Sequence, residues 1–264
     1  MKKSILKHFV MILAMAACSS VGAATAVAHD TWAVMEDYTL AKQGTVALGV
    51  VSSHLFSIPG RDFVTPDKVE KAFFLAPDGA ETAALPIEKN AFQSKQALKT
   101  SGTHLAVAVS KPGFSSKTTE GYKQGKTKKD LNNVVSCSYS EKFSKALFSV
   151  GTPGGDVFSR TLGHSLEIIP LKDPSGMKTG EVLSVKVLFQ GKPLSTTVSG
   201  TYTGFSEDPG TFAYATSTNK EGIAKIKLIH DGTWLLLVKQ KLDYPDTTVC
   251  DTKSFSSALT FNVR

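Results

Sequence analysis

Two histidines stand where this sequence could build a metal site. His29 directly follows the small residues Ala26, Val27 and Ala28, and His54 follows an apolar stretch. If the chain is cut after Ala28, His29 offers a free α-amine and an imidazole, which can chelate one metal ion through two nitrogens of a single residue. An α-amine has a reference pKa of about 7.7–8.0, so a metal can displace its proton near neutral pH. We therefore predict a metal site that proteolysis creates; the alternative is an ordinary frayed terminus.

Further ligands are expected close to these two histidines. Asp30 can add an oxygen ligand or hold the imidazole as a hydrogen-bond acceptor. His54 opens a loop after a strand, where side chains converge on rigidly placed sites. His104 lies within an expected strand, where it either joins the ligands or is an ordinary strand histidine. Imidazole is a common ligand for nickel, copper and zinc, so the predicted site suits a transition metal.

The sequence lacks the local patterns of several enzyme classes. It contains no glycine-rich phosphate loop, no Gly-x-Ser-x-Gly elbow and no His-Glu-x-x-His pair. Ser-His-Asp combinations can always be drawn in a serine-rich chain, but nothing local supports one. We therefore expect a binding protein without catalysis.

The charge of the chain gives little information about its partners. The formal net charge of +7 includes three lysines near the N-terminus, Lys2, Lys3 and Lys7. Without them the protein is only mildly basic, which is weak support for an anionic partner. We expect no nucleic-acid partner.

The first 28 residues have the order of a cleavable signal peptide. The three lysines precede an uncharged apolar run from residue 9 to residue 17, and small residues follow up to Ala28. A membrane-spanning helix needs roughly 20 apolar residues. The run is too short for a stable anchor, and no later stretch approaches that length. We predict cleavage before His29, export to the periplasm and a mature chain without a transmembrane segment.

Two other outcomes of processing stay open. Cleavage near Ala23 or Ala24 would leave a few residues ahead of His29. Lipidation of Cys18 would instead anchor the protein as a lipoprotein. The residues before Cys18 lack the branched side chain that usually stands three places ahead of a lipidated cysteine. We therefore keep the start at His29.

Removal of the signal peptide leaves two cysteines, Cys137 and Cys250. An even pair in an oxidising compartment indicates one disulfide. The bond would close a loop of more than a hundred residues, for which chain-entropy models give a stabilisation on the order of 4–5 kcal/mol. The alternative is two unpaired thiols.

The elements that must position these residues are strands. Several segments alternate apolar and polar side chains, as in Leu183, Val185 and Val187 against Ser184 and Lys186, which is typical of a half-buried strand. Residues 140–150 are ambiguous between strand and helix. The expected strands span residues 45–52, 69–75, 103–110, 166–171, 182–190, 197–203, 222–228, 234–241 and 258–263.

Strands at this spacing predict an all-β fold of two β-sandwich domains. A run of turn residues, 152–155, marks the boundary. We expect an N-terminal β domain over residues 29–160, which holds the metal site, and an immunoglobulin-like sandwich over residues 164–264. Residues 111–129 contain six lysines and three glycines, which indicates a solvated hairpin tip, with a surface for an anionic partner as the alternative.

Several segments of the chain resemble one family of exported proteins. The most specific of them is Leu166-Glu167-Ile168-Ile169-Pro170-Leu171, and together they look like the periplasmic component family associated with cobalt and nickel transport, of the CbiK-type, NikM-like kind. The resemblance covers nearly the whole mature chain. The matching segments are His29-Asp30-Thr31-Trp32, Ser53-His54-Leu55-Phe56, the run from Gly163 to Pro174, Gly191-Lys192-Pro193-Leu194 and Asp231-Gly232-Thr233-Trp234.

The resemblance implies a β-rich protein that captures Ni²⁺ or Co²⁺ for the membrane permease of a cobalt/nickel uptake system, with a histidine at the mature N-terminus. His29 and His54 fall on that pattern. Ligand affinity alone rises from cobalt to nickel to copper, so selectivity would have to come from geometry or supply.

Two other classes of protein fit the same residues. A Cu²⁺-binding histidine-brace protein, or a copper oxidase that attacks polysaccharides, also joins an N-terminal histidine to a second histidine on a β-sandwich. A structural module of the cell envelope would carry the histidines incidentally. Metal binding by the processed protein separates these classes.

Overall fold

The computed structural model describes residues 29–56 and 63–264. The expected signal peptide, with Cys18, lies outside the described residues, as do residues 57–62 of the loop after His54. Within the described chain no helix is long and apolar enough to span a membrane. Its helices are the 3-10 turns η1 (Pro66–Lys68), η2 (Glu88–Asn90), η3 (Val157–Ser159) and η4 (Pro174–Gly176). The remaining regular structure is β-strand, so the expected all-β class is confirmed.

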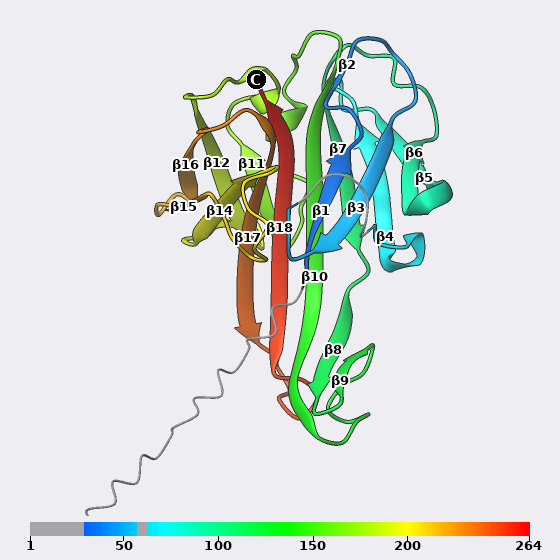
Figure 1. Ribbon diagram of the computed structural model, residues 1–264, viewed down its shortest axis with the longest axis vertical. Helices are drawn as coiled ribbons and strands as arrows, with labels where there is room; N and C mark the ends of the chain where they lie inside the picture. The colour runs from blue at the N-terminus through cyan, green and yellow to red at the C-terminus, as the bar shows by residue number, and fades with distance from the viewer. Residues whose placement is uncertain (1–28, 57–62) are drawn as a thin grey trace, which may run out of the picture.

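One large sheet of 14 strands runs through both halves of the chain (Figure 1). β2 (Thr39–Leu40) and β8 (Gly113–Thr118) pair with its long central strand β10, and β9 (Gly121–Gln124) pairs with β8. The other strands are, in spatial order, β1 (Asp30–Met35), β3 (Ala47–Ser53), β6 (Ala91–Ser94), β5 (Glu81–Pro86), β4 (Val69–Leu75), β7 (Gly102–Ser110), β10 (Val134–Val150), β18 (Thr252–Val263), β17 (Gly232–Asp243), β14 (Thr197–Tyr202) and β15 (Tyr214–Ser217).

A second sheet of four strands packs against one face of the large sheet. Apolar side chains from both sheets form the largest core cluster, which includes Ile168 and Val185 from the small sheet and Phe143, Leu236 and Leu259 from the large one. The C-terminal half is thus a β-sandwich, as expected. The strands of the small sheet are β11 (Leu166–Pro170), β12 (Val182–Phe189), β13 (Lys192–Pro193) and β16 (Ile223–Lys227).

The N-terminal strands form a second core on the opposite face of β10. Ala33 of β1, Leu48 of β3 and Phe74 of β4 meet Phe148 of β10 in this cluster. A third, smaller cluster joins the other face of β1 to β17 and β18, through Trp32, Leu237 and Ala258 among others. Both faces of β1 are therefore buried, which is why its sequence does not alternate.

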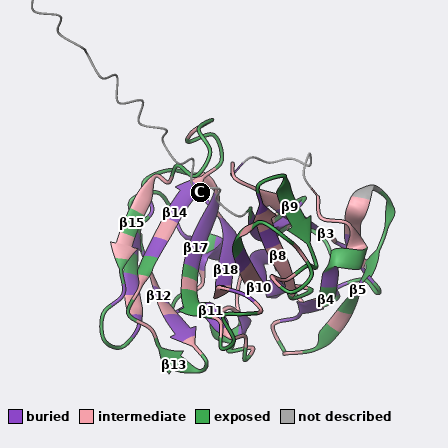
Figure 2. Ribbon diagram, turned by 90° about the horizontal axis from the view of Figure 1, so that it is seen from below, coloured by how far each residue is buried: buried purple, intermediate pink, exposed green. Residues whose placement is uncertain are grey.

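β10 and β18 lie at the centre of the molecule as long parallel neighbours (Figure 1). Seen from below, the buried residues concentrate on these strands and on β17 and β14, while exposed residues lie at the outer turns (Figure 2). The predicted disulfide is confirmed. Cys137 at the start of β10 bonds Cys250, just before β18, with an S–S distance of 2.01 Å and a sequence separation of 113. It joins the two central strands at the same end.

All nine expected strand ranges overlap strands of the structure. The ambiguous segment 140–150 is the second part of β10, so it is a strand. The lysine-rich segment forms the β8–β9 hairpin at the end of the molecule, as expected of a hairpin tip (Figure 1). Hydrogen bonding between β10 and β18 crosses the expected domain boundary near residue 160. The division into domains 29–160 and 164–264 stays a prediction.

Candidate metal-binding site

The register of β1 and β3 brings His29 and His54 together. Asp30 lies opposite Ser53 in this antiparallel pair. The next residue outward on each strand is therefore a histidine, and the two rings meet edge to face, with their centroids 4.2 Å apart and their planes at 86°. His29 is exposed and His54 is partly exposed. The structure thus places next to each other the two histidines that the sequence predicted as metal ligands.

Side chains of the central sheet hold β1 in place, although no strand of the described chain pairs with its outer edge. The carbonyl of His29 accepts a hydrogen bond from Lys142 Nζ at 2.8 Å, and that of Thr31 accepts one from Ser144 Oγ at 3.2 Å. Thr260 Oγ1 donates in the same way to the carbonyl of Ala33, at 2.7 Å. Buried carbonyl groups need such partners. The position of His29 therefore depends on β10 and β18.

Asp30 is engaged in an ion pair. Its carboxylate, on a residue that is only 8% exposed, contacts Lys239 Nζ of β17 at 2.6 and 2.9 Å. Lys142 lies on the same side of the sheet, and its ammonium also reaches Thr31 Oγ1 at 3.3 Å. Burial lowers the pKa of Lys142; Asp30 opposes this shift and Lys239 adds to it. Asp30 therefore anchors the start of β1 to β17.

The far side of the histidine pair is bounded by a loop from the C-terminal half. Gly210 N donates to the carbonyl of His54 at 2.8 Å. The same loop carries two exposed carboxylates, Glu207 and Asp208. Close by in the chain, Trp32 packs edge to face on Phe56, with ring centroids 5.6 Å apart. Both of these rings are buried, while His29 is exposed and His54 is partly exposed.

The spacing of the two imidazoles suits a shared metal ion. Two imidazoles bound at a right angle to one metal, with metal–nitrogen distances of about 2.1 Å, hold their ring centroids about 4.5 Å apart. The observed 4.2 Å is close to this value. Among the described residues, no third His, Cys, Asp or Glu completes a group that could hold a metal ion.

His104 lies apart from this pair. It is fully buried on β7, stacked on Phe148 with ring centroids 5.4 Å apart, and its Nε2 contacts the carbonyl of Thr100 at 2.8 Å. Phe148 is six positions along β10 from Lys142, which is about 20 Å at the usual rise of a strand. Burial lowers the pKa of the His104 imidazole. The structure gives His104 a place in the N-terminal core.

A second group of ionisable side chains is buried between β10 and β11. Lys145 and Glu167 form an ion pair at 2.5 Å, with side chains only 3% and 1% exposed. Glu167 also accepts hydrogen bonds from the backbone N–H groups of Leu162 and Gly163, at 2.8 and 3.2 Å. His164 stacks on Phe143, and burial, with Lys145 adding to it, lowers its pKa to about 4. This cluster fixes the connection between the two halves of the chain.

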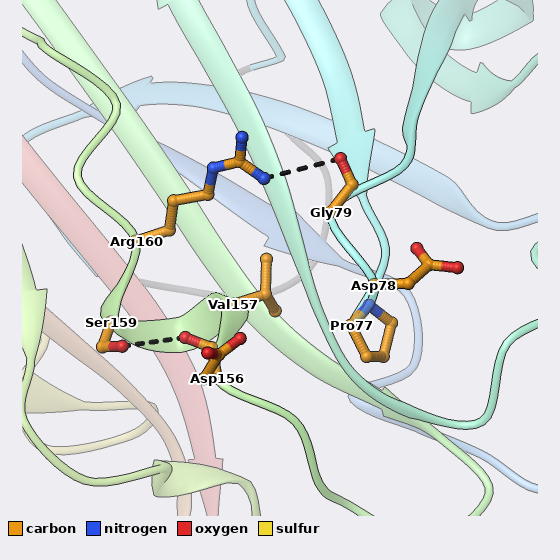
Figure 3. Close-up of a pocket in the computed structure, with 7 residues that line it drawn as sticks. All are labelled: Pro77, Asp78, Gly79, Asp156, Val157, Ser159 and Arg160. Atoms are coloured by element: carbon orange, nitrogen blue, oxygen red, sulfur yellow. Dashed lines mark hydrogen bonds between the residues drawn. The ribbon is translucent and has the colours of Figure 1, made fainter.

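A shallow pocket of about 300 Å³ lies between the β4–β5 turn and η3 (Figure 3). The guanidinium of Arg160 extends to the carbonyl of Gly79, at 3.5 Å, and Asp78 and Asp156 also line the pocket (Figure 3). None of the histidines lines this pocket. No residue that lines this pocket was predicted from the sequence to be functional.

Sequence reasoning missed Lys142 and Lys239, which hold β1 in place. Each occupies an ordinary alternating position of a long strand. Their partners, His29 and Asp30, are more than a hundred residues away in the chain. No local pattern could have linked them.

These features define an all-β protein with an exposed histidine pair at the start of an edge strand that side chains anchor. The chain belongs to the family described as a domain of unknown function, DUF4198, whose model matches residues 26–241. No curated protein sequence matches the chain.

Several solved structures share a general likeness with it. Murine CEACAM1b is 8% identical, with a TM-score of 0.22, over 89% of this chain and 99% of that one. The D0–D1 domain of intimin is 14% identical, with a TM-score of 0.22, over 90% and 100%. The Escherichia coli adhesin FdeC is 9% identical, with a TM-score of 0.24, over 90% and 65%. At these TM-scores the likeness carries no argument about function.

Proposed function

We propose that this protein is an extracytoplasmic metal-binding protein that captures Ni²⁺ or Co²⁺ for a membrane uptake system. The observation that supports this most directly is the contact between His29 and His54, whose ring centroids are 4.2 Å apart. Cleavage before His29 would add the α-amine as a third nitrogen. Three nitrogens from two residues begin a square-planar or octahedral set.

The mechanism is capture and release, without catalysis. The two histidines sit on strand ends that the central sheet holds rigidly, so little ordering is needed when a metal binds. Because the rings face outward, a membrane permease could take over the metal by ligand exchange. The choice of nickel or cobalt rests on the family resemblance, since imidazole ligands alone favour copper.

The test is calorimetry with Ni²⁺, Co²⁺ and Cu²⁺ on protein that begins at His29. We expect one strong site for nickel or cobalt. A chain with one extra residue before His29, and a His54→Ala variant, should each bind at least about tenfold more weakly, because each loses one nitrogen ligand. Unchanged binding in both would contradict the proposal, and a site specific for copper would favour the copper class.

His230→Ala is the matched control. His230 is also a surface histidine, half exposed, but it stacks on Tyr202 and its Nδ1 lies near Asp231. Its removal should leave metal binding unchanged. Intact-mass measurement of the exported protein should show a start at His29, and a diacylglyceryl mass on Cys18 would contradict the processing on which the site depends.

A further inference from the structure

A strip of lysines and serines on the central sheet adjoins the histidine pair. Lys142, Ser256 and Lys239 lie opposite one another on β10, β18 and β17. Both lysines face β1, because they contact His29, Thr31 and Asp30. The next row on the same face of the sheet lies two residues further along each strand, beyond the start of β1. It consists of Ser140, Ser254 and Lys241. We call these two rows the Ser–Lys strip.

The Ser–Lys strip carries more positive than negative charge. Asp30 pairs with Lys239, whereas Lys142 donates to a carbonyl and a hydroxyl, neither of which is charged. No ion pair within the described chain includes Lys142 or Lys241. The carboxylates of Glu207 and Asp208 belong to a separate loop, whose Gly210 N donates to the carbonyl of His54 and which contributes no residue to the strip. The strip beside His29 is therefore suited to an anion.

This charge bears on what completes the metal site. Two imidazoles leave several positions on the metal open. Ammonium groups repel a bare dication and attract carboxylates. Building on the proposed function, we propose that the site takes its metal as a complex with a small carboxylate chelator, whose free carboxylates lie on the Ser–Lys strip.

The dimensions agree with such a ligand. Successive rows on one face of a sheet are about 7 Å apart, which is the size of a small di- or tricarboxylate. Ser140 and Ser254 are partly exposed, and their hydroxyls are 2.8 Å apart, so they can also donate to a carboxylate oxygen. A chelator bound to the metal through some carboxylates would place the others over Lys142 and Lys241.

The experiment uses the protein that begins at His29, nickel and radiolabelled citrate. After gel filtration we expect label to co-elute with the protein only when nickel is present, in a ratio close to one. Lys241→Gln should weaken citrate retention roughly two- to fivefold, as for an exposed ion pair, and Lys142→Gln by about tenfold, as for a hydrogen bond to a charged group. Lys227→Gln, exposed on β16, is the control and should have no effect.

Failure of this proposal can be told apart from failure of the proposed function. Nickel that binds through His54 without retaining any label would overturn the chelator proposal and leave the metal site standing. Equal retention by the wild-type protein and by Lys241→Gln and Lys142→Gln would overturn it too. Absence of nickel binding in the wild-type protein, with and without citrate, would overturn both. Lys241 contacts nothing on β1 in the structure, so its variant keeps the test valid if Lys142→Gln folds poorly.

Discussion

The histidine pair at the start of β1 and the cluster of Lys145, Glu167 and His164 place similar side chains in opposite settings. The cluster is buried, and Glu167 has a donor on each carboxylate oxygen. The histidine pair lies at the surface, where His29 is exposed and His54 is partly exposed. In the first arrangement Lys145 and Glu167 bind each other within the fold, whereas the second presents two imidazoles at the surface.

This difference between a buried cluster and a surface pair shows which residues make a segment of the sequence distinctive. The run Leu166-Glu167-Ile168-Ile169-Pro170-Leu171 contains Glu167, and the structure gives this residue a role in joining β10 to β11. A buried charge tolerates few replacements, because it needs its partner and its hydrogen bonds. The surface pair requires only two histidines and one register. A distinctive motif can therefore mark the scaffold while the chemistry lies elsewhere.

The largest expected effect is on the buried cluster. Glu167→Gln removes the counter-charge of the Lys145 ammonium, which then stays buried without compensation, so unfolding should need about 3–5 kcal/mol less. Glu81→Gln is the control, because its pair with Lys71 is about half exposed, and it should cost less than about 1 kcal/mol. Denaturant titration measures both. Equal losses would show that the two regions are not distinct.

A second prediction concerns pH. The pKa of His164 is about 4 in the folded protein, against about 6.5 in an unfolded chain. Between these values the unfolded chain binds a proton that the folded protein does not, so this contribution is complete above about pH 6.5 and is lost as pH falls towards 4. The loss should be roughly 1–3 kcal/mol. His164→Gln should flatten the slope of stability against pH. The smaller slope that remains would come in part from His104, whose pKa burial also lowers, and in part from carboxyl groups whose pKa is lowered by hydrogen bonds, such as Asp246.

Lys142→Met tests the anchoring of β1. The carbonyl of His29 and the hydroxyl of Thr31 lose a donor, which should lower stability by about 1–2 kcal/mol. Lys225→Met, exposed on β16, should stay within about 0.5 kcal/mol of the wild type. Hydrogen exchange of the β1 amides should rise only in the first variant. Unchanged exchange would mean that β1 is held by its apolar contacts alone.

The smallest expected effect on stability comes from His54→Ala. Its ring lies at the surface in an edge-to-face contact with His29, so we expect a loss of no more than about 1 kcal/mol. The same variant should show the large loss of metal affinity described above. Thermal unfolding without metal measures the first quantity. A loss as large as that of Glu167→Gln would assign the pair to the scaffold.

Much of the fold could be predicted from the sequence, because strands with one buried face alternate visibly. β12 is the clearest example, with Leu183, Val185 and Val187 on its buried face. β1 and β10 were harder to predict from the sequence. β1 is buried on both faces and shows no alternation, while the second part of β10 is buried almost throughout between two cores. Periodicity cannot separate such a strand from a buried helix.

The candidate site could be predicted only in part. His54 was recognisable because it follows a strand, and His29 because it follows small residues. Their contact depends on the register of β1 against β3, which is set by packing on β10 and β18. His104 shows the converse limit. Its face, shared with Ala106 and Ala108, packs into the N-terminal core, while Leu105 and Val107 on the other face pack into the largest core cluster. Alternation alone did not show that β7 is buried on both faces.

The position of β18 constrains how the molecule can assemble. This strand, residues 252–263, lies between β10 and β17 in the middle of the large sheet. A chain that emerges N-terminus first therefore leaves the edge of β10 unpaired until almost all of the residues up to 263 are available. Contacts this distant in sequence form slowly. Completion of the large sheet therefore waits for the strand that is made last.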